Sequence, residues 1–402
     1  MTRSVLSFAV FVAVSLAVLG GMHGYLWVRL VRDPALPDPW RRIATVALLL
    51  LTFALPLGML ALRFAPRPLA QIVPVVAFTW LGLAFLLFSA LLVLDAVRLA
   101  SQAGAWLADW LRTAPEPPAD PDRRLFVARV VAGTAAIATA GASAYAFRSA
   151  TGPAEVTEVP VKLERLPPTL SGLTIAQITD LHVGPTIGER YVRRVVDQVN
   201  ALRPDVVAVT GDLVDGSVAQ LGEAVSHLGR LRARHGVYFV TGNHEYYSGV
   251  GEWLDELRRL GLRVLRNERV AIGGPGASID LAGVNDYGAT GLGDGHAPDL
   301  GRALAGRDPD RGLVLLAHQP RGVDAAVRAG VELQISGHTH GGQLAPFNLV
   351  VGAVFPYLKG LYPGVEAGGR RGQVFVSRGT GYWGPPLRLG SPPELAKIVL
   401  TA

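Results

Sequence analysis

Apolar and polar residues divide this chain into two halves with different patterns. In the first half, four stretches contain no Asp, Glu, Lys or Arg, namely residues 5–28, 43–62, 68–94 and 130–147. The first three are at least as long as the roughly 20 residues that an α-helix needs to cross a bilayer. Apolar runs of this length exceed ordinary buried helices, so the pattern predicts a membrane region over residues 1–150 with about four transmembrane helices.

The second half, residues 151–402, alternates short apolar runs with amphipathic segments. Fully apolar strands that alternate with helices are typical of sheets whose two faces are both covered. The pattern therefore predicts an α/β domain. The expected strands are 173–179, 206–210, 237–241, 263–266, 279–284, 313–317 and 332–336, and the expected helices are 190–202, 218–234 and 251–261.

Composition narrows the classes of function. The chain has 402 residues and no cysteine, which excludes disulfides and thiolate metal ligands. Its net charge of +6 is modest, the only lysines are Lys162, Lys359 and Lys397, and no basic run is interleaved with aromatic residues. We therefore expect no nucleic-acid partner.

Arginines are distributed unequally among the loops of the membrane region. The loop between the first and second spans and the loop between the third and fourth spans are rich in arginine. The opposite ends of the spans carry only Arg3, Arg63, Arg67 and Arg148. Since positive residues favour the cytoplasmic side, the two arginine-rich loops are predicted to be cytoplasmic. We therefore expect a multi-pass protein of the cytoplasmic membrane, with its N-terminus and residues 151–402 outside the cytoplasm. The two loops contain nine arginines: Arg29, Arg32, Arg41, Arg42, Arg98, Arg112, Arg123, Arg124 and Arg129.

The fourth span differs from the others because it is rich in Ala and Gly. Arg123 and Arg124 precede it and are followed by a phenylalanine, an arrangement similar to a twin-arginine export signal. Small residues between Ala142 and Ala146 offer signal-peptidase patterns. An ordinary helix anchored by the two arginines explains the same residues, and both interpretations give the same orientation. The Pro-rich segment 114–121 is predicted to be a cytoplasmic linker.

Side chains with oxygen or imidazole donors follow the predicted strands of the second half. Open α/β sheets place their sites at the carboxyl ends of strands, so these donors are expected to meet. These donors are more numerous than a single metal ion requires. Two metal ions that share a bridging carboxylate form a well-known hydrolytic site. The five motifs are Asp180-Leu-His182, Gly211-Asp212-Leu-Val-Asp215, Gly242-Asn243-His244-Glu245, His318 and Gly337-His338-Thr-His340.

The order and spacing of these motifs resemble the calcineurin-like metallophosphoesterase superfamily, over residues from about 155 to 402. The resemblance implies two facing mixed β-sheets flanked by helices, with two metal ions at the rim between the sheets. Oxygen and imidazole donors without thiolates fit Mn²⁺, Fe or Zn²⁺, and the sequence does not choose among them. By resemblance, Asp180, His182 and His340 would bind the first ion, Asn243, His318 and His338 would bind the second, and Asp212 would bridge them.

The resemblance also implies catalytic roles. His244 would protonate the leaving oxygen of the substrate, which the near-neutral pKa of histidine permits. Asp215 would orient His244, although a role in its own loop explains it too. Asn243 would also contact the substrate, and the two ions would activate a bridging water as hydroxide. Arg388 is expected either to hold a substrate phosphate or to form a surface ion pair.

Two segments, Gly337–Gln343 and Ser377–Arg388, resemble a membrane-associated bacterial branch of the superfamily with twin-arginine signals in some members. We therefore expect a metal-dependent phosphoesterase that hydrolyses phosphodiester, phosphomonoester or lipid-linked phosphate bonds at the membrane surface. A phospholipid or a cell-wall phosphate would be its substrate, and the lipid bilayer its partner. The alternative is a membrane-anchored binding or sensor module with a structural metal site. The intact set of donors together with His244 favours the enzyme.

Overall fold

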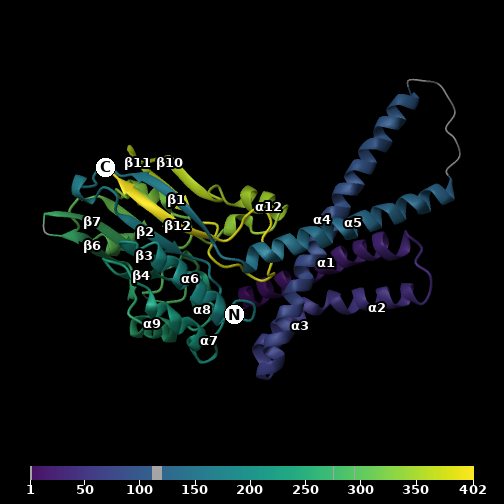
Figure 1. Ribbon diagram of the computed structural model, residues 1–402, viewed down its shortest axis with the longest axis horizontal. Coiled ribbons are helices and arrows are strands. Elements are labelled where there is room, and N and C mark those ends of the chain that lie inside the picture. Colours follow the sequence, from purple (N-terminus) through teal and green to yellow (C-terminus); the bar gives the residue numbers. More distant parts are fainter. Residues whose placement is uncertain (1, 111–119, 275, 294) are drawn as a thin grey trace. The chain divides into compact units, whose positions relative to one another are not determined.

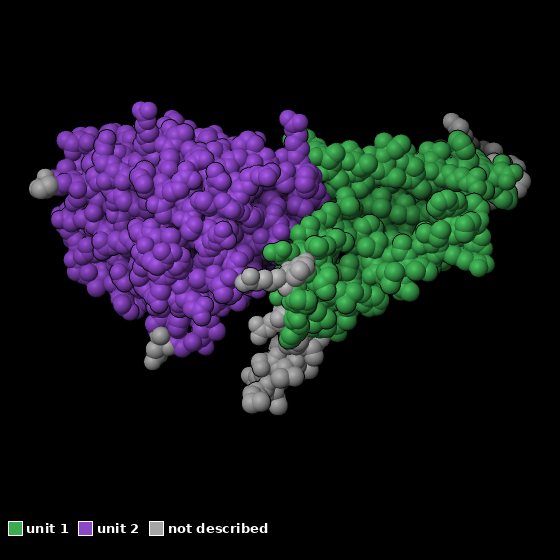
Figure 2. Space-filling model, turned by 60° about the horizontal axis from the view of Figure 1, so that its bottom comes forward, with its two compact units in different colours: residues 1–146 green, residues 147–402 purple. Residues whose placement is uncertain are grey.

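The chain forms two compact units, which we call unit 1 (Met1–Ala146) and unit 2 (Phe147–Ala402) (Figures 1 and 2). The computed structural model describes residues 2–110, 120–274, 276–293 and 295–402. The expected linker 114–121 lies largely outside these residues. The boundary between the units falls within one long helix, a few residues before the boundary expected at 150.

Unit 1 is built from helices. Three stretches are long and apolar enough to cross a membrane: Val12–Arg32, Leu69–Ala108 and Pro121–Thr151. A fourth crossing exists only if Trp40–Thr52 and Ala54–Leu62, which are bent by 41° at their junction, count as one broken span. The helices of this region are α1 (Thr2–Trp27), the π-helix η1 (Val28–Arg32), α2 (Trp40–Thr52), α3 (Ala54–Phe64), α4 (Arg67–Trp110) and α5 (Pro121–Thr151).

The second expected span, 43–62, is not one continuous helix. It breaks at Phe53, whose φ of −93° and ψ of 0° are not helical. Pro56 explains the break, because it has no N–H for the carbonyl of Thr52 and its ring crowds that carbonyl. Proline is tolerated in the first turn of a helix, which is where Pro56 lies in α3.

Polar contacts join α1 and its π-helical extension to α4. The indole N–H of Trp80 donates to His23 at 2.9 Å, and the hydroxyl of Tyr25 donates to Asp95 at 2.6 Å. The guanidinium of Arg29 then pairs with Asp95 at 2.5 Å. These contacts advance in the same direction along both helices, so α1 and α4 run parallel to each other.

Unit 2 contains two six-stranded sheets. Within each sheet most neighbouring strands are parallel, and β12–β2, β10–β11 and β6–β7 are antiparallel, so both sheets are mixed. The first sheet has the order β1 (Glu155–Lys162), β12 (Glu394–Thr401), β2 (Thr174–Ile178), β3 (Val206–Thr210), β4 (Val237–Val240) and β5 (Arg263–Val264). The second has the order β10 (Gly360–Ala367), β11 (Arg370–Val376), β9 (Leu333–Ser336), β8 (Leu313–Leu316), β7 (Ala277–Gly283) and β6 (Glu268–Gly274).

The central strands β2, β3, β8 and β9 bury both of their faces. In β3, Val206 and Ala208 lie in the core shared by the two sheets, whereas Val207 and Val209 lie in the core under the helices. This confirms the expected α/β fold with two facing mixed sheets and explains why the strands read as continuous apolar runs. The helices of unit 2 are α6 (Glu189–Ala201), α7 (Val218–Val225), α8 (Asn243–Tyr247), α9 (Val250–Arg259), α10 (Leu300–Ala303), α11 (Val323–Arg328) and α12 (Phe347–Val354).

The helix expected over 218–234 is shorter than the pattern indicated. Its α-helical part ends at Val225 and continues as a 3₁₀ helix, η3 (Ser226–Arg230). Gly222 and Gly229 lie in this segment, and glycine disfavours a helix interior by about 1 kcal/mol relative to alanine. The remaining short 3₁₀ helices are η2 (Pro168–Leu170), η4 (Tyr287–Ala289) and η5 (His340–Gly342).

Candidate metal centre

The candidate ligands converge because the strands that precede them are neighbours. Strands β2, β3 and β4 are adjacent and parallel in the first sheet, as β8 and β9 are in the second. Their carboxyl ends therefore form one rim between the two sheets. The side chains at this rim are Asp180 and His182 after β2, Asp212 after β3, Asn243 at the start of α8, His318 after β8, His338 after β9 and His340 in η5.

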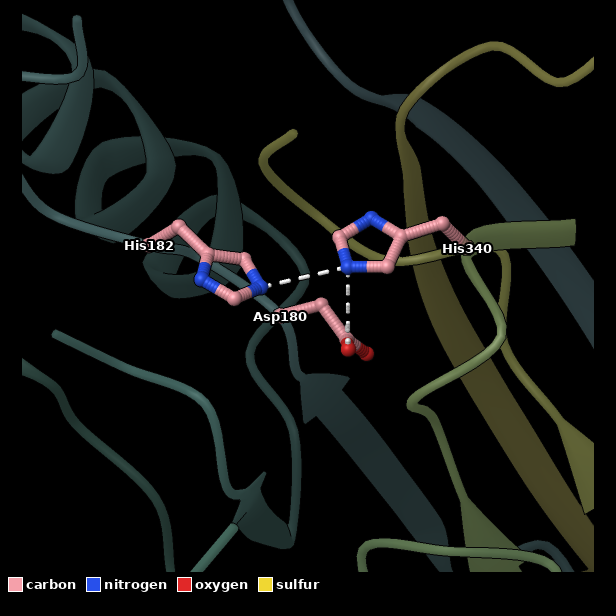
Figure 3. Close-up of side chains that lie close together, drawn as sticks. All are labelled: Asp180, His182 and His340. Atoms are coloured by element: carbon pink, nitrogen blue, oxygen red, sulfur yellow. Dashed lines mark hydrogen bonds and ion pairs between the residues drawn. The ribbon is translucent and has the colours of Figure 1, made fainter. Parts of the chain in front are cut away.

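Asp180, His182 and His340 form the first donor group (Figure 3). Nε2 of His182 lies 3.1 Å from Nε2 of His340, which is 3.3 Å from Oδ1 of Asp180. All three side chains are buried. Two imidazole nitrogens and a carboxylate oxygen that point at one another suit a cation, because a shared positive charge offsets the repulsion between their lone pairs.

Asp212, His318 and His338 form the second donor group. Nε2 of His318 lies 3.1 Å from Oδ2 of Asp212 and 3.2 Å from Nδ1 of His338. Nδ1 of His318 donates to the carbonyl of Thr210 at 2.8 Å, which leaves Nε2 as the ligand atom, as in many metal-bound histidines. Burial and the neighbouring His318 lower the pKa of His338 to about 3.

Asp212 lies between the two groups. Its Oδ2 is 3.1 Å from Nε2 of His318 and 3.8 Å from Nε2 of His182. The bridging role that the resemblance implies needs a carboxylate in such a position. Asn243 contributes a side-chain oxygen that is buried and, within the described part of the chain, accepts no hydrogen bond. Buried acceptors are rarely left unpaired, so a cation at this oxygen accounts for it.

The backbone at the rim is strained. The described residues include nine non-glycine positions with positive φ, and five of them are candidate ligands, with φ between 50° and 73°. Strain of this kind costs about 1–3 kcal/mol per residue and clusters at functional sites. The five are Asp180, His182, Asp212, His338 and His340.

Two glycines allow the close packing at the rim. A Cβ on Gly337 would lie 2.2 Å from Oδ2 of Asp180, and a Cβ on Gly242 would lie 2.2 Å from Oδ1 of Asp212. Any side chain there would displace a candidate ligand. The donor chemistry, the unpaired oxygen of Asn243 and the strained backbone thus all fit divalent cations.

Asp215 contacts both a candidate ligand and the candidate acid. Its carboxylate accepts from Nδ1 of His182 at 3.2 Å and from Nδ1 of His244 at 2.5 Å. Burial lowers the pKa of His244, but the hydrogen bond to Asp215 and the charge of Asp212 outweigh it and raise the pKa to about 9. Nε2 of His244 lies 3.9 Å from Oδ2 of Asp212, so a proton on Nε2 faces the rim.

Glu245 is a residue to which the sequence pattern assigned no role. Its carboxylate is fully buried and accepts from the backbone N–H groups of Gly242 (2.6 Å), Leu213 (2.7 Å) and Asp212 (3.1 Å). These bonds fasten the loop after β3 to the loop after β4. Glu245 lies three residues after Gly242, the residue that precedes α8. This is the spacing of a capping box, and it is the signal in the sequence that could have identified Glu245.

Arg388 is not placed as expected for a substrate ligand or for a surface ion pair. Its side chain is fully buried. The guanidinium donates to the carbonyls of five residues and contacts Nδ1 of His340 at 3.1 Å, so its N–H groups are already used inside the protein. Arg388 therefore holds the loops around His340 together. The five carbonyls belong to His340, Arg378, Gly379, Gly381 and Ser391.

Two facing mixed sheets with carboxylate, amide and imidazole donors at their shared rim define a metal-dependent phosphoesterase domain. Residues 173–342 match the family model described as calcineurin-like phosphoesterase. Relatives named "transmembrane protein with metallophosphoesterase domain" occur in Bos taurus, 40% identical over 337 residues (81% of this chain, 73% of that protein), and in Danio rerio, 34% identical over 400 residues (96% and 87%). The chain belongs to the calcineurin-like phosphoesterase family.

The relatives are found in animals and in bacteria. An uncharacterized metallophosphoesterase of Helicobacter pylori strain J99 is 39% identical over 247 residues, which cover 61% of this chain and 64% of that protein. The similarity to the Danio rerio protein, in contrast, includes the N-terminal helices. The relatives therefore extend beyond the bacterial branch that the sequence resembled.

Proposed function

We propose that the protein is a binuclear metal-dependent phosphoesterase that acts on phosphate esters at a membrane surface. The observation that carries the proposal is the position of Asp212, whose Oδ2 lies between the first and the second donor group. A purely structural metal site does not need a further histidine at its edge that is held by a carboxylate. The pairing of His244 with Asp215 therefore favours the enzyme over the binding or sensor module.

The mechanism follows from the side chains at the rim. Bound divalent cations supply positive charge for the phosphate oxygens and lower the pKa of water to near neutral. The cations would be held by Asp180, Asn243 and the histidines of the two donor groups. Asp215 accepts a hydrogen bond from Nδ1 of His244, which leaves the proton on Nε2 free to be transferred. His244 then gives the proton on Nε2 to the leaving oxygen as the phosphorus–oxygen bond breaks. The oxygen of water forms the new bond to phosphorus, one proton of that water passes to solvent, His244 regains a proton from solvent, and the alcohol is released.

The full-length protein is expected to hydrolyse bis(p-nitrophenyl) phosphate or p-nitrophenyl phosphate when supplied with Mn²⁺, and to lose this activity after chelation. Restoring Mn²⁺, Zn²⁺ or Fe²⁺ separately identifies the metal that supports turnover. Steady-state rates for the two compounds distinguish a diesterase from a monoesterase. A metal-loaded protein that hydrolyses neither of these compounds, nor any lipid phosphate ester, would contradict the proposed function.

We further propose that unit 2 lies outside the cytoplasm. Two membrane-spanning helices of one chain can point in the same direction only if the chain between them crosses the bilayer in the opposite direction. Because α1 and α4 run parallel, the bent pair α2–α3 is interpreted as one complete crossing. Arg129 near the start of α5 donates to the carbonyl of Pro34 at 3.2 Å, so α5 starts at the arginine-rich end of the bundle and returns. Four crossings leave the N-terminus and unit 2 on the same side, opposite the arginine-rich loops.

Reporter fusions test this orientation. An alkaline phosphatase reporter, which is active only after export, is expected to be active when fused after Ala150 and silent when fused after Asp120. Replacing Arg123 and Arg124 by lysine keeps the positive charge, so ordinary insertion should survive, whereas recognition as a twin-arginine signal should fail. A silent reporter at Ala150 in the wild-type sequence would contradict the topology and indicate cytoplasmic phosphate esters as substrates.

A further inference from the structure

Exposed apolar side chains are concentrated beside the metal centre. After α5, the described residues of unit 2 expose eight large hydrophobic side chains, of which four lie on α12 and two, Tyr247 and Trp383, lie next to the candidate acid. The remaining two are Val156 and Leu292. Helix α12 contains no charged residue and buries none of its side chains. Its exposed residues are Phe347, Leu349, Val350 and Val354, with Leu349 the most exposed at 71%.

These side chains border the centre through specific contacts. Helix α12 follows η5 in the chain, and the ring of Phe355, just after α12, lies 5.6 Å from that of His338. The side chain of Gln343 accepts from the backbone N–H of Trp383 and donates to its carbonyl, each at 2.9 Å. This ties the loop that carries Trp383 to the segment that leads into α12.

The rings of Trp383 and Tyr247 both contact the ring of the candidate acid, His244. The ring of Trp383 is 5.8 Å from His244, and the ring of Tyr247 is 5.4 Å from it. We call α12, Trp383 and Tyr247 the apolar rim. A water-soluble phosphate ester does not require such a surface, because the metal ions and His244 suffice to bind its phosphate.

The chain itself indicates what covers the apolar rim. Helix α5 ends at Thr151, and strand β1 begins at Glu155, so only a short connection joins a helix that is apolar enough to cross a membrane to the first strand of unit 2. The guanidinium of Arg194 on α6 donates to the carbonyl of Thr151 at 2.8 Å. The strands of unit 2 thus follow directly after a helix that is long and apolar enough to cross a membrane, which makes a bilayer the apolar surface that the chain itself would bring near.

The charges on α6 and the residue types of the apolar rim also suit a bilayer. Arg190 and Arg193 lie with Arg194 on α6, and arginines near a membrane surface attract anionic head groups. Trp and Tyr are enriched at membrane interfaces, where the ring is apolar and one edge is polar. An uncharged apolar helix such as α12 gains from burial in the head-group region, whereas exposure to water disfavours it.

We propose that α12 inserts its exposed side chains into the bilayer surface and that the substrate is a phosphate ester carried by a membrane lipid. The lipid head group enters the metal centre past Trp383 and Tyr247 while its acyl chains stay in the bilayer. This inference rests on the proposed function for its chemistry. The insertion of α12 is tested separately from catalysis.

Insertion is measured with a single thiol. Because the chain has no cysteine, Leu349→Cys introduces the only one, and it can be labelled with an environment-sensitive nitrobenzoxadiazole probe. In full-length protein reconstituted into phosphatidylcholine–phosphatidylglycerol vesicles, brominated acyl chains are expected to quench this probe by about twofold or more. The matched control is Asp255→Cys on α9, whose side chain is 81% exposed and which should stay unquenched. Equal quenching at the two positions, or none at Leu349→Cys, overturns the insertion of α12.

The substrate class is tested with a pair of double variants. Leu349→Gln/Val350→Gln keeps helix-forming residues but removes the apolar surface, whereas Leu349→Met/Val350→Ile keeps that surface. In vesicles that contain phosphatidic acid and phosphatidylglycerol, the glutamine variant is expected to hydrolyse lipid about 10-fold more slowly than wild type. Its rate with soluble bis(p-nitrophenyl) phosphate or p-nitrophenyl phosphate should stay unchanged, as should both rates of the conservative variant.

The outcomes separate the two proposals. If wild type hydrolyses a soluble ester but neither lipid, or if the glutamine variant hydrolyses lipid as fast as wild type, the lipid assignment is wrong and the phosphoesterase proposal stands. If wild type hydrolyses neither soluble nor lipid esters with any of the metals, the proposed function is wrong. The probe measurement on Leu349→Cys then still decides whether α12 enters the bilayer.

Discussion

Replacement of Asp212 by asparagine is expected to remove both metal ions and to slow hydrolysis by about 10³-fold or more, since the loss of both cations removes the charge that stabilises the transition state. The physical reason is the position of Oδ2, which lies 3.1 Å from Nε2 of His318 and 3.8 Å from Nε2 of His182. Asparagine offers a neutral oxygen or an N–H group at this place. Neither can bridge two cations, and an N–H group repels them.

Elemental analysis of the purified full-length variant checks this expectation. The backbone N–H of His244 donates to Oδ1 of Asp212 at 2.9 Å, and an asparagine oxygen can accept the same bond, so the loop should keep its conformation. Asp255→Asn, an exposed change of the same kind on α9, is the matched control and should keep its metals. An Asp212→Asn protein with wild-type metal content would rule out the bridging assignment.

Replacement of His244 by alanine is expected to leave both metal ions bound and to lower kcat by about 10²-fold or more, the scale of a positioned general acid. His244 contributes its Nε2 proton to the leaving oxygen, and its Nδ1 is occupied by Asp215. Metal content and kcat are measured on the same preparation. Loss of metal together with normal activity per bound ion would show instead that His244 is a ligand, as its membership of a donor group with His182 and Asp212 permits.

Asp215→Asn is expected to behave differently from His244→Ala because Asp215 has two partners. It accepts from Nδ1 of His182, a candidate ligand, as well as from Nδ1 of His244. Removing its charge should therefore weaken metal binding by about 10–100-fold, the range found for carboxylates behind metal-bound histidines, in addition to slowing turnover. A metal titration of Asp215→Asn beside His244→Ala distinguishes the two effects. Equal metal affinity in both variants would limit Asp215 to orienting His244.

The surroundings of Arg388 show where sequence reasoning ends at this site. Arg388 was expected near the substrate because an arginine guanidinium can donate two hydrogen bonds to one phosphate group. Nothing in the neighbouring residues indicates that its guanidinium is buried among five carbonyls from loops between residues 340 and 391. Four of these carbonyls belong to residues 378–391 and the fifth to His340, and only the folded loops bring them to one point.

The sequence by itself determined the α/β class, the apolar N-terminal helices and the candidate donors at the ends of strands. Each of these depends on local order, because apolar periodicity reports secondary structure and a donor after a strand must lie at the rim of its sheet. The tertiary structure alone decided that α1 and α4 run parallel, that Asp215 serves two histidines and that α12 is left uncovered beside the centre. These features depend on contacts between distant segments, and a sequence pattern shows which face of an element is apolar but not what lies against it.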